Sequence, residues 1–186
     1  MAGLIEGIYV SPVKTELPIE LGEVTAVAGR GLEGDRYYLG VGTYSDHPDP
    51  RGRDLTLIEA SALERAGLDA AAARRNLVVS GLTLADLVDK RFRIGQVECL
   101  GRRLCEPCEH LQRLTRPGVL RALVHTGLRA DILTGGQITR GNTIQLLAPV
   151  GLHPAAQHRP ELFGAPRQEL AGAPVEDDAV AADGVE

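Results

Sequence analysis

The sequence predicts a mainly β domain with short helices, in which the strands form a largely antiparallel, β-barrel-like sheet. Short runs rich in Val, Ile and Leu recur between Gly-rich turns, which indicates about seven to nine strands. Strands and helices do not alternate regularly, and this argues against a parallel βαβ architecture. Aromatic residues make up only 3% of the chain, so the core must be built from aliphatic side chains.

The hydrophobic pattern places the elements in order along the chain. The expected strands cover residues 4–10, 22–28, 55–58, 77–79, 92–94, 97–100, 128–133 and 143–147. The expected helices cover residues 59–66, 108–114 and 118–125, with a short helix at 69–73 capped by Asp69 and a helical turn at 84–88 capped by Thr83. Residues 40–54 consist almost entirely of turn-forming residues and are expected to form a long loop.

The composition divides the chain into one domain and a tail. Residues 1–150 carry the strand and helix pattern, which suits a single domain. Residues 151–186 are rich in Ala, Pro, Asp and Glu, and we expect them to be partly disordered or loosely docked.

Charge and cysteine content exclude several classes of function. The net charge of −5 argues against binding nucleic acid through a bulk positive field. No apolar segment approaches the roughly 20 residues needed to span a bilayer, and the N-terminus has no signal-peptide pattern. Three cysteines are an odd number, which fits free thiols in a reducing cytoplasm.

The stretch from Arg103 to Leu111 carries the chemistry of greatest interest, because it holds Cys105, Cys108 and His110. Four interpretations compete. The two thiols form half of a zinc site, a thioredoxin-like redox pair or an inert buried pair, or Cys108 alone is a reactive thiolate. The zinc interpretation is weakened because the sequence offers no second pair of ligands with the usual spacing. The redox interpretation is weakened because the βαβ context of thioredoxin-like pairs is missing. A thiol before a helix is favoured as a thiolate, because the helix N-terminus carries partial positive charge.

A second candidate region is the glycine-rich segment 29–37, in which Arg30, Asp35 and Arg36 are interleaved with three glycines. It either lines a site for an anionic ligand or forms a tight, solvated turn. Arg75 and Asn76 stand at the mouth of the strand 77–79, where they are placed to hold an anion or to tie down backbone.

Taken in order, these stretches resemble MOSC domains, which are named after the C-terminal domain of molybdenum cofactor sulfurases. The resemblance runs over residues 3–147 and is carried by the ordered set of motifs more than by any single one. Its stretches are Gly31–Arg36, Leu55–Glu59, Arg75–Leu82, Arg93–Gly95, Glu106–Cys108, Gly127–Leu133, Gly135-Gly136 and Gly141-Asn142. It implies a MOSC, pyruvate kinase barrel-like fold.

The resemblance also implies a site. Cys108 would be the molybdenum ligand or the carrier of a sulfur atom. Arg36, Arg75, Asn76 and Arg129 would hold the phosphate of the pterin or its polar rim. Relatives with this domain include cofactor sulfurases and reductases of N-hydroxylated compounds. The implied cofactor is therefore the molybdenum cofactor, and the implied partner is an electron donor protein or a cysteine desulfurase. An oligomer is compatible with the sequence.

The chain departs from the family pattern at two positions and in its extent. Arg75 precedes Asn76 where relatives often have an acidic residue, and Asn142 follows Gly141 where Asp is common. The desulfurase domain of the full-length sulfurases is not expected here, and Lys14 and Lys90 are the only lysines. Pyridoxal phosphate is therefore not expected in this chain.

Three hypotheses follow from the sequence. The first is a molybdenum-cofactor-binding domain that uses Cys108 in reduction or in cofactor sulfur transfer. The second is a non-enzymatic persulfide relay or interaction module, in which Cys108 carries sulfur without molybdenum. The third is a small zinc-binding β-domain.

Overall fold

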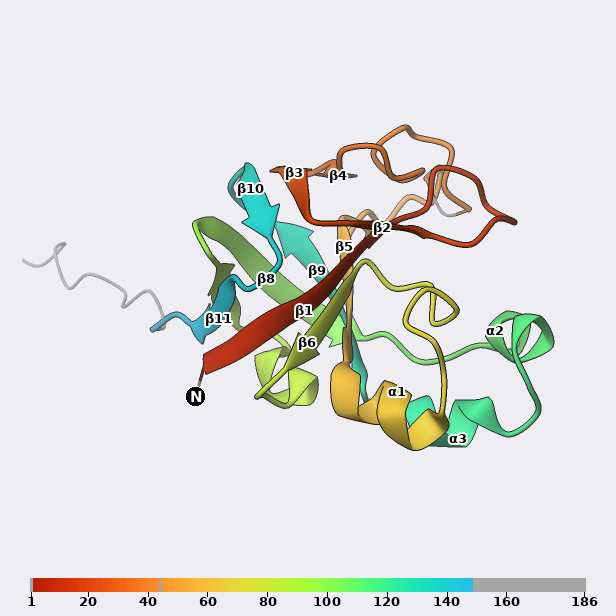
Figure 1. Cartoon of the computed structure of the whole chain (residues 1–186). Helices are drawn as coiled ribbons and strands as arrows, with labels where there is room; N and C mark the ends of the chain where they lie inside the picture. Colours follow the sequence, from red (N-terminus) through yellow and green to blue (C-terminus); the bar gives the residue numbers. More distant parts are fainter. Residues whose placement is uncertain (1, 44, 149–186) are drawn as a thin grey trace, which may run out of the picture. The chain divides into compact units, whose positions relative to one another are not determined.

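The protein is described by a computed structural model over residues 2–43 and 45–148 (Figure 1). The strands are β1 (Ala2–Val10), β2 (Ile19–Leu21), β3 (Glu23–Val27), β4 (Gly31–Leu32), β5 (Leu55–Glu59), β6 (Leu77–Ser80), β7 (Arg91–Ile94), β8 (Val97–Leu104), β9 (Gly127–Ile132), β10 (Gly136–Thr139) and β11 (Thr143–Leu146). The helices are α1 (Ala60–Ala66), α2 (Glu109–Leu114) and α3 (Val119–Leu123), with a 3₁₀ helix at Leu84–Leu87. The expected tail at 151–186 lies outside the described residues.

Seven strands close into a β-barrel, which confirms the predicted fold class. They follow the order β11-β7-β8-β9-β5-β6-β1, and the pairing of β1 with β11 closes the ring. The pairs are antiparallel except β5 with β6, which are parallel and are joined through α1. Strand β2 pairs antiparallel with the end of β1, and β10, β3 and β4 form a separate small sheet.

The side chains of the barrel strands alternate between two hydrophobic cores, because successive side chains of a strand point to opposite faces. Leu57, Leu77 and Val79 point into the barrel, and they are fully buried there together with Phe92. The neighbouring Ile58 and Val78 belong instead to an outer core beneath the helices. That outer core holds Ala62, Leu63 and Ala66 of α1, Leu111 of α2, and Val119 and Leu123 of α3.

Several local predictions are confirmed and others are wrong. Gly67 ends α1 in the left-handed conformation (φ 54°), where Leu68 N–H donates to the Leu63 carbonyl at 3.0 Å. Asp69 caps a turn and not a helix, through bonds from the backbone N–H groups of Ala71 and Ala72. Thr83 stands at the predicted N-cap of the 3₁₀ helix but forms no side-chain cap bond within the described residues. The Leu84 N–H donates to Glu59 Oε1 at 2.9 Å.

The barrel register brings polar residues from distant parts of the sequence to one place. Ile8 pairs with Leu77, so the chain after β1 lies beside the chain before β6. Thr56 of β5 pairs with Arg129 of β9. The end of β1, the start of β6 and the middle of β9 therefore meet around the start of β5.

Candidate functional site

A small polar pocket, hereafter the arginine pocket, lies where these strand ends meet, and it encloses about 60 Å³. Its lining comes from Tyr9, Ser11, Pro18, Asp35, Arg36, Tyr37, Thr56, Arg74, Arg75, Asn76 and Arg129. The structure thus brings together Arg36, Arg75, Asn76 and Arg129, the four residues that the family resemblance nominated for the cofactor phosphate. Arg74 is an additional pocket residue that sequence reasoning missed.

Asp35 organises the pocket wall from a position that is only 4% exposed. Its Oδ2 accepts hydrogen bonds from the backbone N–H of Ser11 at 2.9 Å and from Asn76 Nδ2 at 3.2 Å. Its Oδ1 accepts the backbone N–H of Tyr37 at 3.0 Å. One carboxylate therefore joins the end of β1, the glycine-rich segment 29–37 and the start of β6.

Asn76 lines the pocket, but its side-chain amide is satisfied within the protein. Oδ1 accepts bonds from Thr56 Oγ1 at 2.8 Å and from the Thr56 N–H at 3.1 Å. Nδ2 donates to the Tyr9 carbonyl and to Asp35, each at 3.2 Å. Since a side-chain amide has two N–H donors and one carbonyl oxygen, Asn76 has no donor left for a ligand. Its place in the structure is that of a residue that positions the pocket.

The pocket arginines are held mostly by backbone carbonyls. Arg36 Nη1 donates to the Ser11 carbonyl, and Arg129 Nη1 to the Gly52 carbonyl, each at 3.4 Å. Among the described residues, the buried Nε atoms of Arg36 and Arg75 find no hydrogen-bond partner. Within residues 2–43 and 45–148, no carboxylate forms an ion pair with any of the pocket arginines.

Arg74 adds a further positive charge. Its Nη2 donates to the carbonyls of Lys14 at 2.6 Å and Glu16 at 2.8 Å. Burial, and secondarily the charge of Arg36, lower the pKa of Arg74. Four arginines therefore line one small pocket, and two of them have Nε donors without a partner in the described part of the chain. Such a set offers the charge and hydrogen-bond donors that an oxyanion accepts.

Cys108 is exposed and stands at the N-cap of α2, as the sequence predicted. It is not among the residues that line the arginine pocket. Cys105 is buried, and its N–H donates to the Gly127 carbonyl of β9 at 2.8 Å. Because three trans peptide units span at most about 11 Å, the Cys108 Cα stays within that distance of the Cys105 Cα.

The segment that carries Cys108 is also tied to the turn before β9. Glu106 Oε1 lies 2.8 Å from His125 Nδ1, and Glu106 Oε2 accepts the His125 N–H at 3.3 Å. His125 adopts a positive φ of 61°. The Cys105–Cys108 segment is therefore fixed at its start by β9 and in its middle by His125.

Within residues 2–43 and 45–148, no three His, Cys, Asp or Glu side chains gather as a metal-donor group. In the same part of the chain, no helix has the length and apolar character that crossing a bilayer requires.

A comparison with protein families agrees with the observed fold. The model of the MOSC domain matches residues 55–145. This chain contains a MOSC domain. MOSC domains are associated with the molybdenum cofactor. No curated protein matches the sequence.

Solved structures share the fold of this MOSC domain at low sequence identity. The YuaD protein of Bacillus subtilis is 16% identical, with a TM-score of 0.64 over 78% of this chain and 96% of its own. YiiM of Escherichia coli is 19% identical, with a TM-score of 0.57 over 81% of this chain and 71% of its own. YiiM of Geobacillus stearothermophilus is 16% identical, with a TM-score of 0.57 over 78% and 75% of the two chains.

Proposed function

We propose that this MOSC domain binds the molybdenum cofactor, with the arginine pocket holding an anionic group of the cofactor and Cys108 providing a thiolate. The observation that carries the proposal is the set of pocket guanidinium groups that have no carboxylate partner among the described residues. Arg36 and Arg75 each have a buried Nε without a partner among the described residues, a donor that a phosphate in this pocket would satisfy.

The roles of the residues differ in this proposal. Arg36, Arg75 and Arg129 bind the anionic group, and Asn76 and Asp35 hold the walls from which these arginines project. Cys108 either ligates molybdenum, for which a soft thiolate is a suitable donor, or carries sulfur as a persulfide. The persulfide would form when the Cys108 thiolate attacks the outer sulfur of a donor persulfide and the donor thiolate leaves. When bound, the cofactor supplies a redox-active metal for reduction of a substrate such as an N-hydroxylated compound, or for cofactor sulfur transfer.

The proposal is tested by metal and pterin analysis of full-length protein produced in a host that makes the cofactor. We expect molybdenum and pterin in proportion to protein, and loss of molybdenum in Cys108→Ser. Cys105→Ser is the matched control, and it is expected to keep molybdenum if it folds, as checked by circular dichroism. Absence of molybdenum and pterin from the wild-type protein would refute the proposal.

A second function is favoured by the exposure of Cys108, since an exposed thiol is accessible to a partner protein. In that case the domain is a persulfide relay that receives sulfur from a cysteine desulfurase. Mass spectrometry after incubation with a desulfurase and cysteine would show one added sulfur atom on Cys108, in protein that contains no molybdenum. In the first proposal, the expected partner is an electron donor protein instead of a desulfurase. Both proposals include a cytoplasmic location.

A further inference from the structure

A second and larger cavity adjoins the arginine pocket. It has a volume of about 490 Å³ and is lined by His47, Asp49, Arg53, Arg103 and Arg129. We call it the loop cavity, because three of these residues belong to the segment 45–53. Its volume falls within the roughly 300–1,000 Å³ of pockets for small organic ligands. Arg129 lines both the loop cavity and the arginine pocket, so the two are neighbours.

The charges around the loop cavity favour an anion. Arg103 of β8 and Arg129 of β9 are directly opposite each other in the antiparallel register. Like charges at such positions destabilise a sheet, and a bound anion between them removes that repulsion. Asp49 does not offset these charges, because Arg51 binds it through Nε and Nη2, each at 2.9 Å. The same hydrogen bonds hold the pKa of Asp49 well below its usual range.

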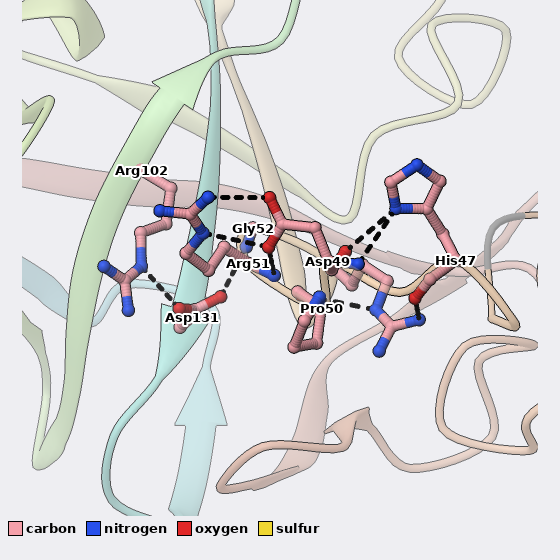
Figure 2. Close-up of polar contacts among 8 residues, drawn as sticks. His47, Asp49, Pro50, Arg51, Gly52, Arg102 and Asp131 are labelled. Carbon is pink, nitrogen blue, oxygen red and sulfur yellow. Dashed lines mark hydrogen bonds and ion pairs between the residues drawn. The ribbon is translucent and has the colours of Figure 1, made fainter.

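The wall formed by the segment 45–53 is fixed in place (Figure 2). Asp131 of β9 accepts the Gly52 N–H through Oδ1 and the Arg102 Nε–H through Oδ2, each at 2.5 Å. The Arg53 guanidinium donates to the carbonyls of His47 and Pro50, each at 3.3 Å. A cavity whose walls are already ordered avoids part of the entropy cost of binding.

We propose that the loop cavity binds a small organic molecule through a carboxylate or phosphate group, and that it is the substrate compartment of this MOSC domain. The assignment of the occupant as a substrate rests on the proposed function, whereas the binding itself does not. Because Arg129 belongs to both cavities, a ligand in the loop cavity lies next to the group held in the arginine pocket. Arg103 and His47 are then the residues that select for an oxyanion.

The proposal is tested by NMR titration of the full-length, cofactor-free protein with three probes of one shape: benzoate, phenyl phosphate and the neutral benzamide. The readouts are the imidazole resonances of His47 and the amide resonance of Gly52. We expect saturable shifts with at least one of the two anions and none with benzamide. The anion that saturates at the lower concentration identifies the preferred group.

Two variants separate the loop cavity from the arginine pocket. Arg103→Gln is expected to weaken binding of the anion by about tenfold, because it removes a charged hydrogen-bond donor. Arg75→Gln, which changes only the arginine pocket, is expected to leave the His47 and Gly52 shifts unchanged. Equal shifts with benzamide, shifts that never saturate, or a loss in Arg75→Gln but not in Arg103→Gln would overturn the proposal. If the protein binds the anion saturably but acquires no molybdenum in a cofactor-competent host, the anion site in the loop cavity is supported and the proposed function is refuted.

Discussion

The Asp35 carboxylate and the Asn76 side-chain amide meet at 3.2 Å in the wall of the arginine pocket, although they are 41 positions apart in the sequence. Around this contact Asp35 accepts two backbone N–H groups, and Asn76 binds both Thr56 and Tyr9. The network joins β1, β5 and the start of β6 in the pocket wall, so a change to either residue is expected to lower the stability of the protein.

Asp35→Asn is expected to destabilise the protein by about 1–3 kcal/mol, because an amide NH₂ would face buried N–H donors that need an acceptor. The free energy of unfolding from urea titration, followed by circular dichroism, measures this change. Glu33→Gln is the control, since Glu33 is exposed in the same segment. Equal stability of the two variants would show that Asp35 does not hold the pocket wall.

Arg75→Gln is expected to keep the fold and to lose the cofactor. Among residues 2–43 and 45–148, the Arg75 guanidinium bonds only to the nearby carbonyls of Ala73 and Arg74, at 3.3 and 3.5 Å. We therefore expect a change of less than about 1 kcal/mol in unfolding free energy. The affinity for the anionic group should fall by about 10- to 100-fold, because the variant loses a hydrogen bond from a charged donor.

The measurement for Arg75→Gln is the molybdenum and pterin content per protein after production in a cofactor-competent host. Arg65→Gln is the matched control, because Arg65 is an exposed arginine of α1 outside the pocket. Full cofactor content in Arg75→Gln would remove this arginine from the proposed site.

Gly52→Ala is expected to disturb the loop cavity and to destabilise the protein by about 2–3 kcal/mol. Gly52 has a positive φ of 71°, and a Cβ there would lie 3.1 Å from the Arg129 Cβ and 3.3 Å from the Arg102 Cβ. Gly34→Ala isolates the backbone part of the cost, since Gly34 has a φ of 83° and open space around an added Cβ. Chemical denaturation of both variants should show the larger loss for Gly52→Ala.

The stability of the protein should decrease in alkaline solution partly because of Cys99. Burial, followed by nearby carboxylates, raises the pKa of this thiol from 9.0 to about 12. Between these values the unfolded chain releases a proton that the folded protein keeps, so unfolding is favoured as pH rises. The contribution of Cys99 is fully present below about pH 9 and is lost toward pH 12.

Comparison of the wild type with Cys99→Ala checks this pH dependence, because the variant lacks the titrating group. We expect the unfolding free energy of the wild type to fall more steeply above about pH 9, whatever the cost of the cavity at neutral pH. Parallel curves for the two proteins would contradict the prediction. Burial raises the pKa of Tyr9 as well, but that group is common to both.

The sequence predicted the barrel because its longer strands are continuous aliphatic runs bounded by glycine. It missed β2 and β4, which have three and two residues and are too short to show an alternating pattern. It also missed β10, because Ile138 is the one aliphatic residue among the four of this strand. It placed Cys108 correctly before a helix, but α3 is shorter than the helix expected at 118–125.

The arginine pocket was predicted only in part. Arg36, Arg75, Asn76 and Arg129 were nominated together, and the barrel register brings them together. Arg74 was missed because nothing local distinguishes it from Arg75, and its positive φ of 57° is visible only in the structure. The sequence also could not show that the Asn76 side-chain amide is fully hydrogen-bonded within the protein, since its partners come from three separate segments.

The family match begins at residue 55, yet the barrel is closed by β1, which precedes it. The unit recognised by homology is therefore smaller than the unit that folds. A fragment that starts at residue 55 would leave β6 and β11 as two open edges, which invite pairing between molecules. It would also lack Asp35 and Arg36, so even a soluble fragment would carry an incomplete anion site.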